Sequence, residues 1–380
     1  MKKQSCLLYR GAITELGKFV DIKRISRIFL VTGKRSYDAS GARKSIEEIF
    51  SNSKIDRFSD FQINPIVEEI LTGVELFRKN SYDLIIAVGG GTAIDIAKAI
   101  RLFAKQSADP LAILHGKENI APVLNPPLLA IPTTAGSGSE ATHFAVVYHD
   151  KHKYSLAHQT VMPEYSCVDG NLTHSLPAEI AAFTGMDALC QAIESFWSVN
   201  STEESRSYSE KAIKLIKSDL VNSVLTADPE SRMKVAEAAH YAGKAINITK
   251  TTGAHAFSYY LTSKRNIPHG QAVGILIEKF LLFNSQSTVK DISDKRGSAY
   301  LLDMFKKLYK LLGEETAPEA AAVLVSLKSS LNLNTPLSSL LITESDRNDF
   351  FASVNTERLK NNPRLITTDN TKELMNLFFS

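Results

Sequence analysis

The sequence has few of the features that mark several large protein classes. Among 380 residues there are three cysteines, Cys6, Cys167 and Cys190, with no CxxC spacing. This excludes a disulfide framework and predicts a reducing, cytoplasmic location. No apolar run approaches the ~18 residues of a membrane-spanning helix, and the basic start MKKQSCLLYRG lacks the apolar core of a secretory signal. The formal net charge is only +3, so we expect neither nucleic acid nor a membrane surface as a partner.

The remaining composition is that of an ordinary globular protein, with 44% apolar and 22% charged residues. No internal repeat or low-complexity segment is evident. A chain of 380 residues is long enough for two domains. Near residues 170–180 the pattern changes from alternating strands and helices to long helical segments. We therefore expect an α/β domain over residues 1–175 and an all-helical domain over residues 176–380.

The first of these regions alternates short apolar runs with amphipathic stretches. Buried strands are predicted at RIFLVTG (27–33), DRFSDF (56–61), DLIIAVGGG (83–91) and PLLAIPTT (127–134). Helical patterns follow the first three, including one long helix over residues 36–50, which predicts a parallel sheet with helices on both faces. HFAVVYHD and the residues after it could add an antiparallel pair. Beyond residue 176, long amphipathic segments dominate and strand-like runs nearly disappear.

Two loops rich in glycine and hydroxyl groups follow predicted strands. The first contains Gly90, Gly91 and Thr92 and opens a helix, so backbone N–H groups can approach a pyrophosphate closely. The second provides hydroxyl groups at Thr133, Thr134 and Ser137. The GxGxxG fingerprint is absent, and a glycine turn beside a solvated helix face is the alternative for the first loop alone. Two such loops at the ends of parallel strands predict a phosphate-containing cofactor.

Four polar residues in the second half of the chain have the spacing of a metal site. Asp187 and Gln191 are four apart in a predicted helix and share one of its faces. His255 and His269 follow, the second just before a glycine where a helix restarts. A carboxylate and two imidazoles can hold a divalent transition metal with one position open. Since a glutamine oxygen is a poorer ligand than an imidazole, Gln191 either completes the site or is a neutral neighbour. The alternative is that all four are core and helix-cap residues.

The motifs GGGTAIDIAK, IPTTAGSGSEAT, GMDAL and IPHG, in this order, resemble the iron-containing (group III) alcohol dehydrogenases. The resemblance implies an N-terminal dinucleotide-binding domain, a helical C-terminal domain, and a cleft between them that holds NAD(P) and a divalent metal, Fe or Zn. The run GMDALCQAIESFWSVNSTEESR and the later AINITKTTGAHAFSYYLTS resemble the phosphonoacetaldehyde reductase (hydroxyethylphosphonate dehydrogenase) subgroup, glutamine included. We expect a homodimer.

Individual roles follow from this resemblance. Asp187, His255 and His269 match metal ligands and are the predicted catalytic residues, whereas Gln191 replaces a histidine of most members. Tyr259 replaces another histidine; we expect it to pack, with a hydrogen bond near the reacting centre as the alternative. The residues implied at the cofactor are Asn64, Asp95, Lys98, Thr133, Thr134, Ser137 and Lys153. The strand at 27–33 ends in Gly33, Lys34 and Ser36 rather than an acidic residue, which favours NADP(H), although some NAD users tolerate glycine.

The implied reaction is hydride transfer from NAD(P)H to a small aldehyde, with the metal as Lewis acid. A phosphonate substrate needs cations, and Lys250 and Arg265 are the candidates, with solvated surface charges as the alternative for each. A general alcohol dehydrogenase acting on short alcohols or diols is a second interpretation. A lyase similar to dehydroquinate synthase is a remote third.

Overall fold

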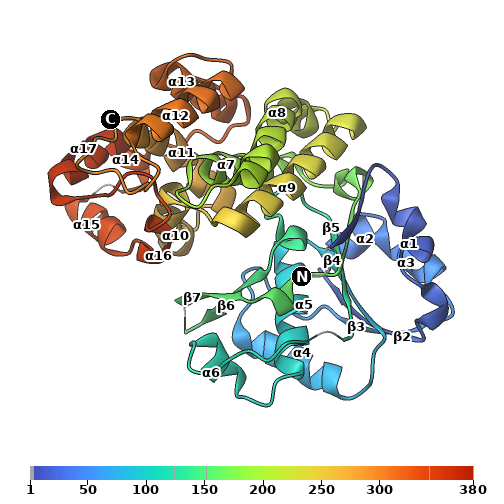
Figure 1. Ribbon diagram of the computed structural model, residues 1–380. Coiled ribbons are helices and arrows are strands. Elements are labelled where there is room, and N and C mark those ends of the chain that lie inside the picture. The colour runs from blue at the N-terminus through green and yellow to red at the C-terminus, as the bar shows by residue number, and fades with distance from the viewer. Residues whose placement is uncertain (1–3, 124, 151, 342, 380) are drawn as a thin grey trace. The chain divides into compact units, whose positions relative to one another are not determined.

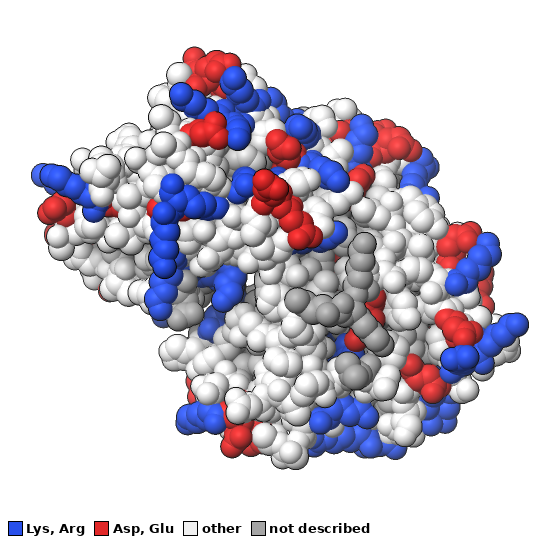
Figure 2. All heavy atoms as spheres, viewed as in Figure 1, with Lys and Arg blue, Asp and Glu red and all other residues white. Residues whose placement is uncertain are grey.

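The computed structural model describes residues 4–123, 125–150, 152–341 and 343–379. The chain divides into two compact units, Met1–Leu176 and Pro177–Ser380. The first contains the strands and the second is helical (Figure 1), so the predicted fold class is confirmed. Within the described residues, none of the helices combines the length and apolar content needed to cross a membrane. On the face shown in Figure 2, acidic and basic side chains are interspersed.

The elements of the first unit, with 3-10 helices labelled η, are β1 (Ser5–Leu8), η1 (Ala12–Glu15), α1 (Leu16–Phe19), η2 (Ile22–Arg24), β2 (Arg27–Thr32), α2 (Ser36–Ala39), α3 (Ala42–Ile49), β3 (Lys54–Phe58), α4 (Val67–Arg78), β4 (Leu84–Gly89), α5 (Gly91–Ala104), α6 (Pro110–Leu114), β5 (Leu128–Pro132), η3 (Ser139–Ala141), β6 (Phe144–His149), β7 (His152–Ala157), η4 (Gln159–Val161), β8 (Tyr165–Val168) and η5 (Gly170–Thr173).

A six-stranded parallel sheet in the order β1-β8-β5-β4-β2-β3 organises this unit. Successive residues of β2 enter different cores: Ile28 packs in the cluster that contains Ile46 of α3, and Phe29 in the cluster that contains Ile96 of α5. Because side chains alternate along a strand, helices cover both faces of the sheet, as predicted. β6 and β7 form a separate antiparallel pair.

Three local features differ from the sequence prediction. The single helix predicted over residues 36–50 is divided into α2 and α3, because Gly41 adopts a left-handed conformation with φ of +80°. The helical pattern that opens at Asn64-Pro65 in the sequence starts as a helix, α4, only at Val67, after Asn64 with φ of +64°. β1 and β8 were not predicted, since each has four residues, too few for a clear periodic pattern.

The elements of the second unit are α7 (Ala178–Trp197), α8 (Glu203–Leu225), α9 (Pro229–Thr249), α10 (Gly253–Arg265), α11 (His269–Ser285), α12 (Ser298–Leu312), α13 (Ala317–Ser330), α14 (Leu337–Leu340), α15 (Glu344–Ala352), α16 (Thr356–Leu359) and α17 (Thr368–Phe379).

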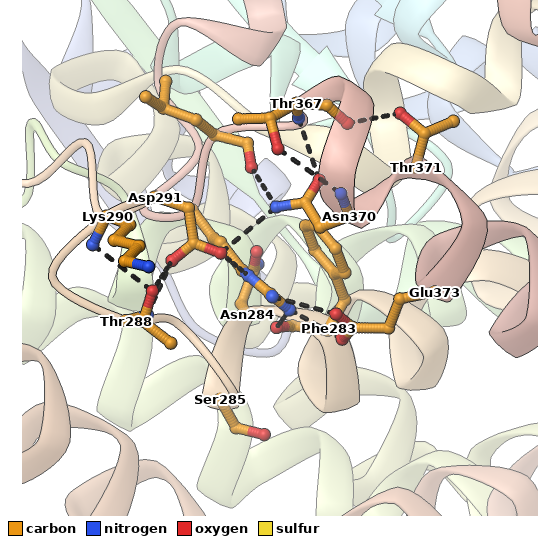
Figure 3. A network of polar contacts seen from close by, with 12 residues as sticks. Phe283, Asn284, Ser285, Thr288, Lys290, Asp291, Thr367, Asn370, Thr371 and Glu373 are labelled. Carbon is orange, nitrogen blue, oxygen red and sulfur yellow. Dashed lines mark hydrogen bonds and ion pairs between the residues drawn. The ribbon is translucent and has the colours of Figure 1, made fainter.

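A network of ion pairs and hydrogen bonds connects the end of this unit to α11 (Figure 3). The guanidinium of Arg364 donates to Asp291 at 2.7 Å, to Glu373 of α17 at 2.7 and 2.9 Å, and to the carbonyl of Phe283 at 2.8 Å. Asn370 donates to the same Asp291 carboxylate at 3.1 Å. Arg364 is only 5% exposed, so this buried network attaches α17 to the helix that begins with His269.

Candidate active site

Three of the predicted metal ligands meet within the helical unit. Asp187 lies in the middle of α7, His255 in the first turn of α10, and His269 at the first residue of α11. One ligand atom of each lies within 4.8 Å of the other two. Asp187 and His255 are buried, whereas His269 is partly exposed. One carboxylate and two imidazoles around a common point fit a divalent transition metal with a side open to a substrate.

Gly270 allows α11 to begin against α7. A Cβ atom at this position would lie 1.8 Å from the carbonyl oxygen of Phe183 and 3.0 Å from Cβ of Asp187. Any side chain would therefore displace the helix that begins with His269. The glycine of the IPHG motif has a steric role, which is to bring His269 within reach of Asp187.

Gln191 lies one turn after Asp187 and is 4% exposed. Its Nε2 donates a hydrogen bond to Oδ2 of Asp187 at 3.2 Å. The other carboxylate oxygen, Oδ1, lies 3.3 Å from Nε2 of His255. In this arrangement Gln191 orients Asp187 through one oxygen and leaves the other directed at the histidine.

Glu194 is a residue that the sequence analysis missed. It lies seven residues after Asp187, is completely buried, and contacts Nδ1 of His255 through Oε2. Burial opposes a positive charge on His255, but Glu194 and Asp187 outweigh it and raise the pKa of His255 to about 9. An acidic residue at helical spacing from Asp187, in an otherwise apolar helix, was the available signal.

The predicted cofactor loops meet at one edge of the sheet in the first unit. They follow β4 and β5, and the N–H of Thr133 donates to the carbonyl of Gly89 at 2.9 Å. A Cβ on Gly91 would lie 2.6 Å from Oγ of Ser137, and one on Gly90 would lie 3.3 Å from Oγ1 of Thr134. The glycines thus allow both loops to pack beside the start of α5, which has no side-chain cap. This edge can accept a pyrophosphate.

Gly33 and Ser36 adjoin the same edge, because the N–H of Gly33 donates to the carbonyl of Val88 at 3.3 Å and Oγ of Ser36 lies near Gly89. Lys34 forms an exposed ion pair with Asp60 at 2.7 Å. A ligand phosphate that binds Lys34 would compete with this carboxylate.

Lys98 is buried and Asp95 is partly buried beneath the second loop. The Lys98 ammonium has no exposed surface and donates to the carbonyl oxygens of Ser139, Thr142 and Phe144 at 2.6, 2.9 and 2.8 Å. Asp95 accepts from Oγ of Ser139 at 2.5 Å and from the N–H of Val146 at 3.0 Å. Burial lowers the pKa of Lys98 to about 8, and Asp95 and Glu140 oppose this shift. These contacts indicate that Lys98 holds the loop and β6 in position.

Lys153 belongs to β7, and Asn64 lies beside the β6–β7 pair. The carbonyl of Pro65, next to Asn64, accepts from the N–H of Tyr148 at 2.8 Å, and Lys153 stands opposite Tyr148 in the antiparallel register. Burial raises the pKa of Asp95, and Lys153 is one of the groups that oppose this. These predicted cofactor residues therefore lie in one region of the first unit.

Family models match both units. The model described as iron-containing alcohol dehydrogenase matches residues 4–170, and the C-terminal model of the Fe-containing alcohol dehydrogenase family matches residues 181–378. The chain belongs to the iron-containing alcohol dehydrogenase family. Its members are oxidoreductases, and the resemblance predicted from the motifs is confirmed.

Two curated relatives of this family member and one solved structure are informative. Phosphonoacetaldehyde reductase of Streptomyces viridochromogenes is 33% identical over 250 residues, a match that covers 63% of each chain. The chain thus spans less than two thirds of that relative. Alcohol dehydrogenase 4 of Schizosaccharomyces pombe is 30% identical, over 83% of this chain and 73% of the relative. Sulfoacetaldehyde reductase of Bifidobacterium kashiwanohense, solved in complex with NAD+, is 29% identical with a TM-score of 0.89, over 100% of this chain and 98% of that structure.

Three other residues that the sequence analysis singled out lie at different distances from Asp187, His255 and His269. The ring of Tyr259 stacks on His269, with centroids 6.1 Å apart and planes 13° apart, in agreement with the packing role predicted for it. Arg265 forms an ion pair with Asp346 at the far end of α10, ten residues or about 15 Å along the helix from His255. Lys250 is exposed at the end of α9, with φ of +59°, in the turn that leads to α10.

Proposed function

We propose that the protein is an NAD(P)H-dependent aldehyde reductase that uses a divalent metal, and that its substrate is a small aldehyde bearing an anionic group. The specific reaction we propose is reduction of phosphonoacetaldehyde to 2-hydroxyethylphosphonate. The observation that supports this most is the convergence of Asp187, His255 and His269 in a chain related to reductases named for phosphono- and sulfoacetaldehyde.

In this proposal Asp187, His255 and His269 hold the metal. A bound divalent ion supplies Lewis-acid polarisation of the aldehyde oxygen. The chain's own residues orient the site: Gln191 holds one oxygen of Asp187, and the ring of Tyr259 stacks on His269. Gln191 as a fourth ligand stays part of the proposal, because rotation of its amide would bring the carbonyl oxygen toward the cluster.

The first unit, residues 1–175 in our prediction, binds NAD(P)H, and residues 176–380 carry the metal and substrate. The start of α5 and the second loop would contact the phosphates through Gly90, Gly91, Thr92, Thr133, Thr134 and Ser137. Gly33, Lys34 and Ser36 would lie toward the adenosine ribose, with Lys34 as the cation that favours NADP(H). Asp95 and Lys98 position these groups, and Asn64 and Lys153 line the region beside them.

For the anionic end of the substrate we favour Lys250 over Arg265. The charge of Arg265 is already engaged by Asp346. Lys250 lies in the same turn as Thr251 and Thr252, and Thr252 is hydrogen-bonded to Glu194, which contacts His255. A cation close to this turn can receive a phosphonate or sulfonate without leaving water entirely.

Substrate comparison tests the proposal. We expect kcat/KM for phosphonoacetaldehyde or sulfoacetaldehyde to exceed that for propanal and lactaldehyde by at least about tenfold, the value of one charge-assisted hydrogen bond. Lys250→Gln should remove most of this preference and leave propanal reduction unchanged, whereas the control Lys264→Gln should leave it intact. Equal kcat/KM for all four aldehydes would refute the anionic substrate.

The metal is tested separately. His269→Ala should abolish both bound metal and reduction, and chelation of the wild type should stop turnover. Gln191→His should tighten metal binding if residue 191 is a ligand, and should weaken it if Gln191 serves only to orient Asp187. Unchanged turnover after complete chelation would refute the Lewis-acid role.

A second function is a dehydrogenase for short alcohols or diols. The 30% identity to an alcohol dehydrogenase over 83% of this chain favours it. The same substrate series distinguishes the two, since oxidation of uncharged alcohols would then be the faster reaction.

A further inference from the structure

Glu194 is a buried carboxylate whose hydrogen bonds are directed at one short segment of chain, residues 252–255. It is completely buried in α7. Oε1 accepts hydrogen bonds from the N–H of Ala254 at 2.7 Å and from the N–H of His255 at 3.3 Å. It also accepts from Oγ1 of Thr252 at 2.9 Å. Oε2 contacts Nδ1 of His255.

The first three contacts make Glu194 the cap of a helix other than its own. α10 begins at Gly253. The side chain of the preceding N-cap residue, Thr252, does not cap the helix. The free N–H groups of the first turn instead point to Glu194, where a negative charge also complements the helix dipole. Trp197, which like Glu194 belongs to α7, donates a hydrogen bond from Nε1 to Oγ1 of Thr252 at 2.8 Å. One side chain therefore sets where α10 starts relative to Asp187.

The contact with Nδ1 determines which histidine nitrogen is available. A carboxylate accepts hydrogen bonds and does not donate them, so His255 keeps a proton on Nδ1. The lone pair of the neutral ring is then on Nε2, the nitrogen that lies 3.3 Å from Oδ1 of Asp187. Both the orientation and the tautomer of the ring thus agree with ligation through Nε2.

We propose that Glu194 is a positioning residue of the metal centre. It keeps the proton of His255 on Nδ1, so that the lone pair is on Nε2, and it anchors the start of α10. This inference rests on the proposed metal-dependent function. It assigns to Glu194 no contact with the substrate or the metal. Glu194 affects the metal only by setting the position and the tautomer of His255.

Glu194→Gln is the direct test, because glutamine has the same shape. Its amide oxygen can still accept from the first turn of α10, but the amide nitrogen then faces Nδ1 as a donor. His255 would be driven to carry its proton on Nε2 and would lose its ligand lone pair. We expect the metal-loaded variant to release Zn²⁺ to a chelator with a dissociation constant 10–100-fold weaker than the wild type, with NAD(P)H binding unchanged. Glu179→Gln, an exposed position on the same helix, is the matched control.

The outcomes are separable. If Glu194→Gln holds Zn²⁺ within about twofold of the wild type, the inference is wrong while the proposed function stands. If the wild type itself binds no metal, the proposed function is wrong. Thr252→Val removes a contact to the start of α10 but keeps the carboxylate against Nδ1, and we expect its Zn²⁺ affinity to stay within about threefold. An equal loss of Zn²⁺ affinity in both variants would show that the position of the start of α10 causes the loss, and it would contradict the role proposed for the His255 tautomer.

The tautomer of His255 can also be measured in the wild type, so this test does not depend on whether a variant folds. Selective ¹⁵N-histidine labelling of the Zn²⁺-loaded protein should show one ring with its proton on Nδ1 and its Nε2 signal shifted by the metal. Metal on Nδ1 of His255 would overturn the proposal.

Discussion

The buried ammonium of Lys98 offers a direct test of how the first unit holds the loop after β5, the second of the predicted cofactor loops. Lys98→Met keeps the length of the side chain and removes the charge and all of its N–H donors. Three backbone carbonyl oxygens, those of Ser139, Thr142 and Phe144, would lose the hydrogen bond that Lys98 donates. Asp95, whose carboxylate lies 4.0 Å from the ammonium, would lose this ion pair.

The size of the effect follows from these contacts. A buried acceptor left without a donor costs roughly 1–3 kcal/mol, and breaking a buried ion pair from one side costs about 3–5 kcal/mol. The two contributions overlap, because they describe one ammonium group. We therefore expect the free energy of unfolding of the first unit to fall by about 3–5 kcal/mol, which lowers its Tm by about 6–20 °C. A looser second loop should also weaken NAD(P)H binding by roughly 5–30-fold, or about 1–2 kcal/mol.

Calorimetry, hydrogen exchange and cofactor titration measure these effects together. Exchange should accelerate most in the segment of residues 139–146, which contains the three carbonyl groups. The control is Lys105→Met, an exposed position at the end of the same helix, for which we expect a change within about 0.5 kcal/mol. If Lys98→Met melts within about 2 °C of this control and residues 139–146 exchange at the wild-type rate, the positioning role of Lys98 is wrong.

Three further predictions concern other parts of the chain. Gly270→Ala should cost about 1–3 kcal/mol and lower the metal content measured by mass spectrometry, whereas Gly274→Ala, where the added Cβ meets the flexible Met186 side chain at 2.8 Å, should retain the metal. Lys34→Ala should raise the KM for NADPH on the order of tenfold and leave the KM for NADH unchanged; equal effects would contradict the preference for NADP(H). Burial would raise the pKa of Asp291, but hydrogen bonds from Thr288 and other groups hold it below its ordinary value of 3.8. Its contribution to stability is therefore fully present above about pH 4 and is lost as the pH falls through the lowered pKa, so Asp291→Asn should flatten the decrease of Tm between pH 4 and pH 2.

Local patterns were sufficient for much of the fold. The apolar runs that became β2, β4 and β5 are long and buried, so their periodicity is strong, and the loops after them meet because the strands are parallel. β1 and β8 escaped prediction because four residues carry too little pattern. The division between α2 and α3 escaped it because a glycine within a helical pattern does not reveal its φ angle.

By itself the sequence determined the α/β and helical regions, the two loops rich in glycine and hydroxyl groups, and Asp187 with Gln191 on one helix face, since each depends on neighbours within a few residues. Only the tertiary structure decided which residues from distant parts of the chain contact these groups and hold them in place. Glu194 contacts a histidine 61 positions away, Lys98 bonds to carbonyl groups 41 to 46 positions away, and Arg265 pairs with Asp346 across 81 positions. The spacing of residues along a helix or strand cannot encode such contacts, because they arise from how separate elements pack.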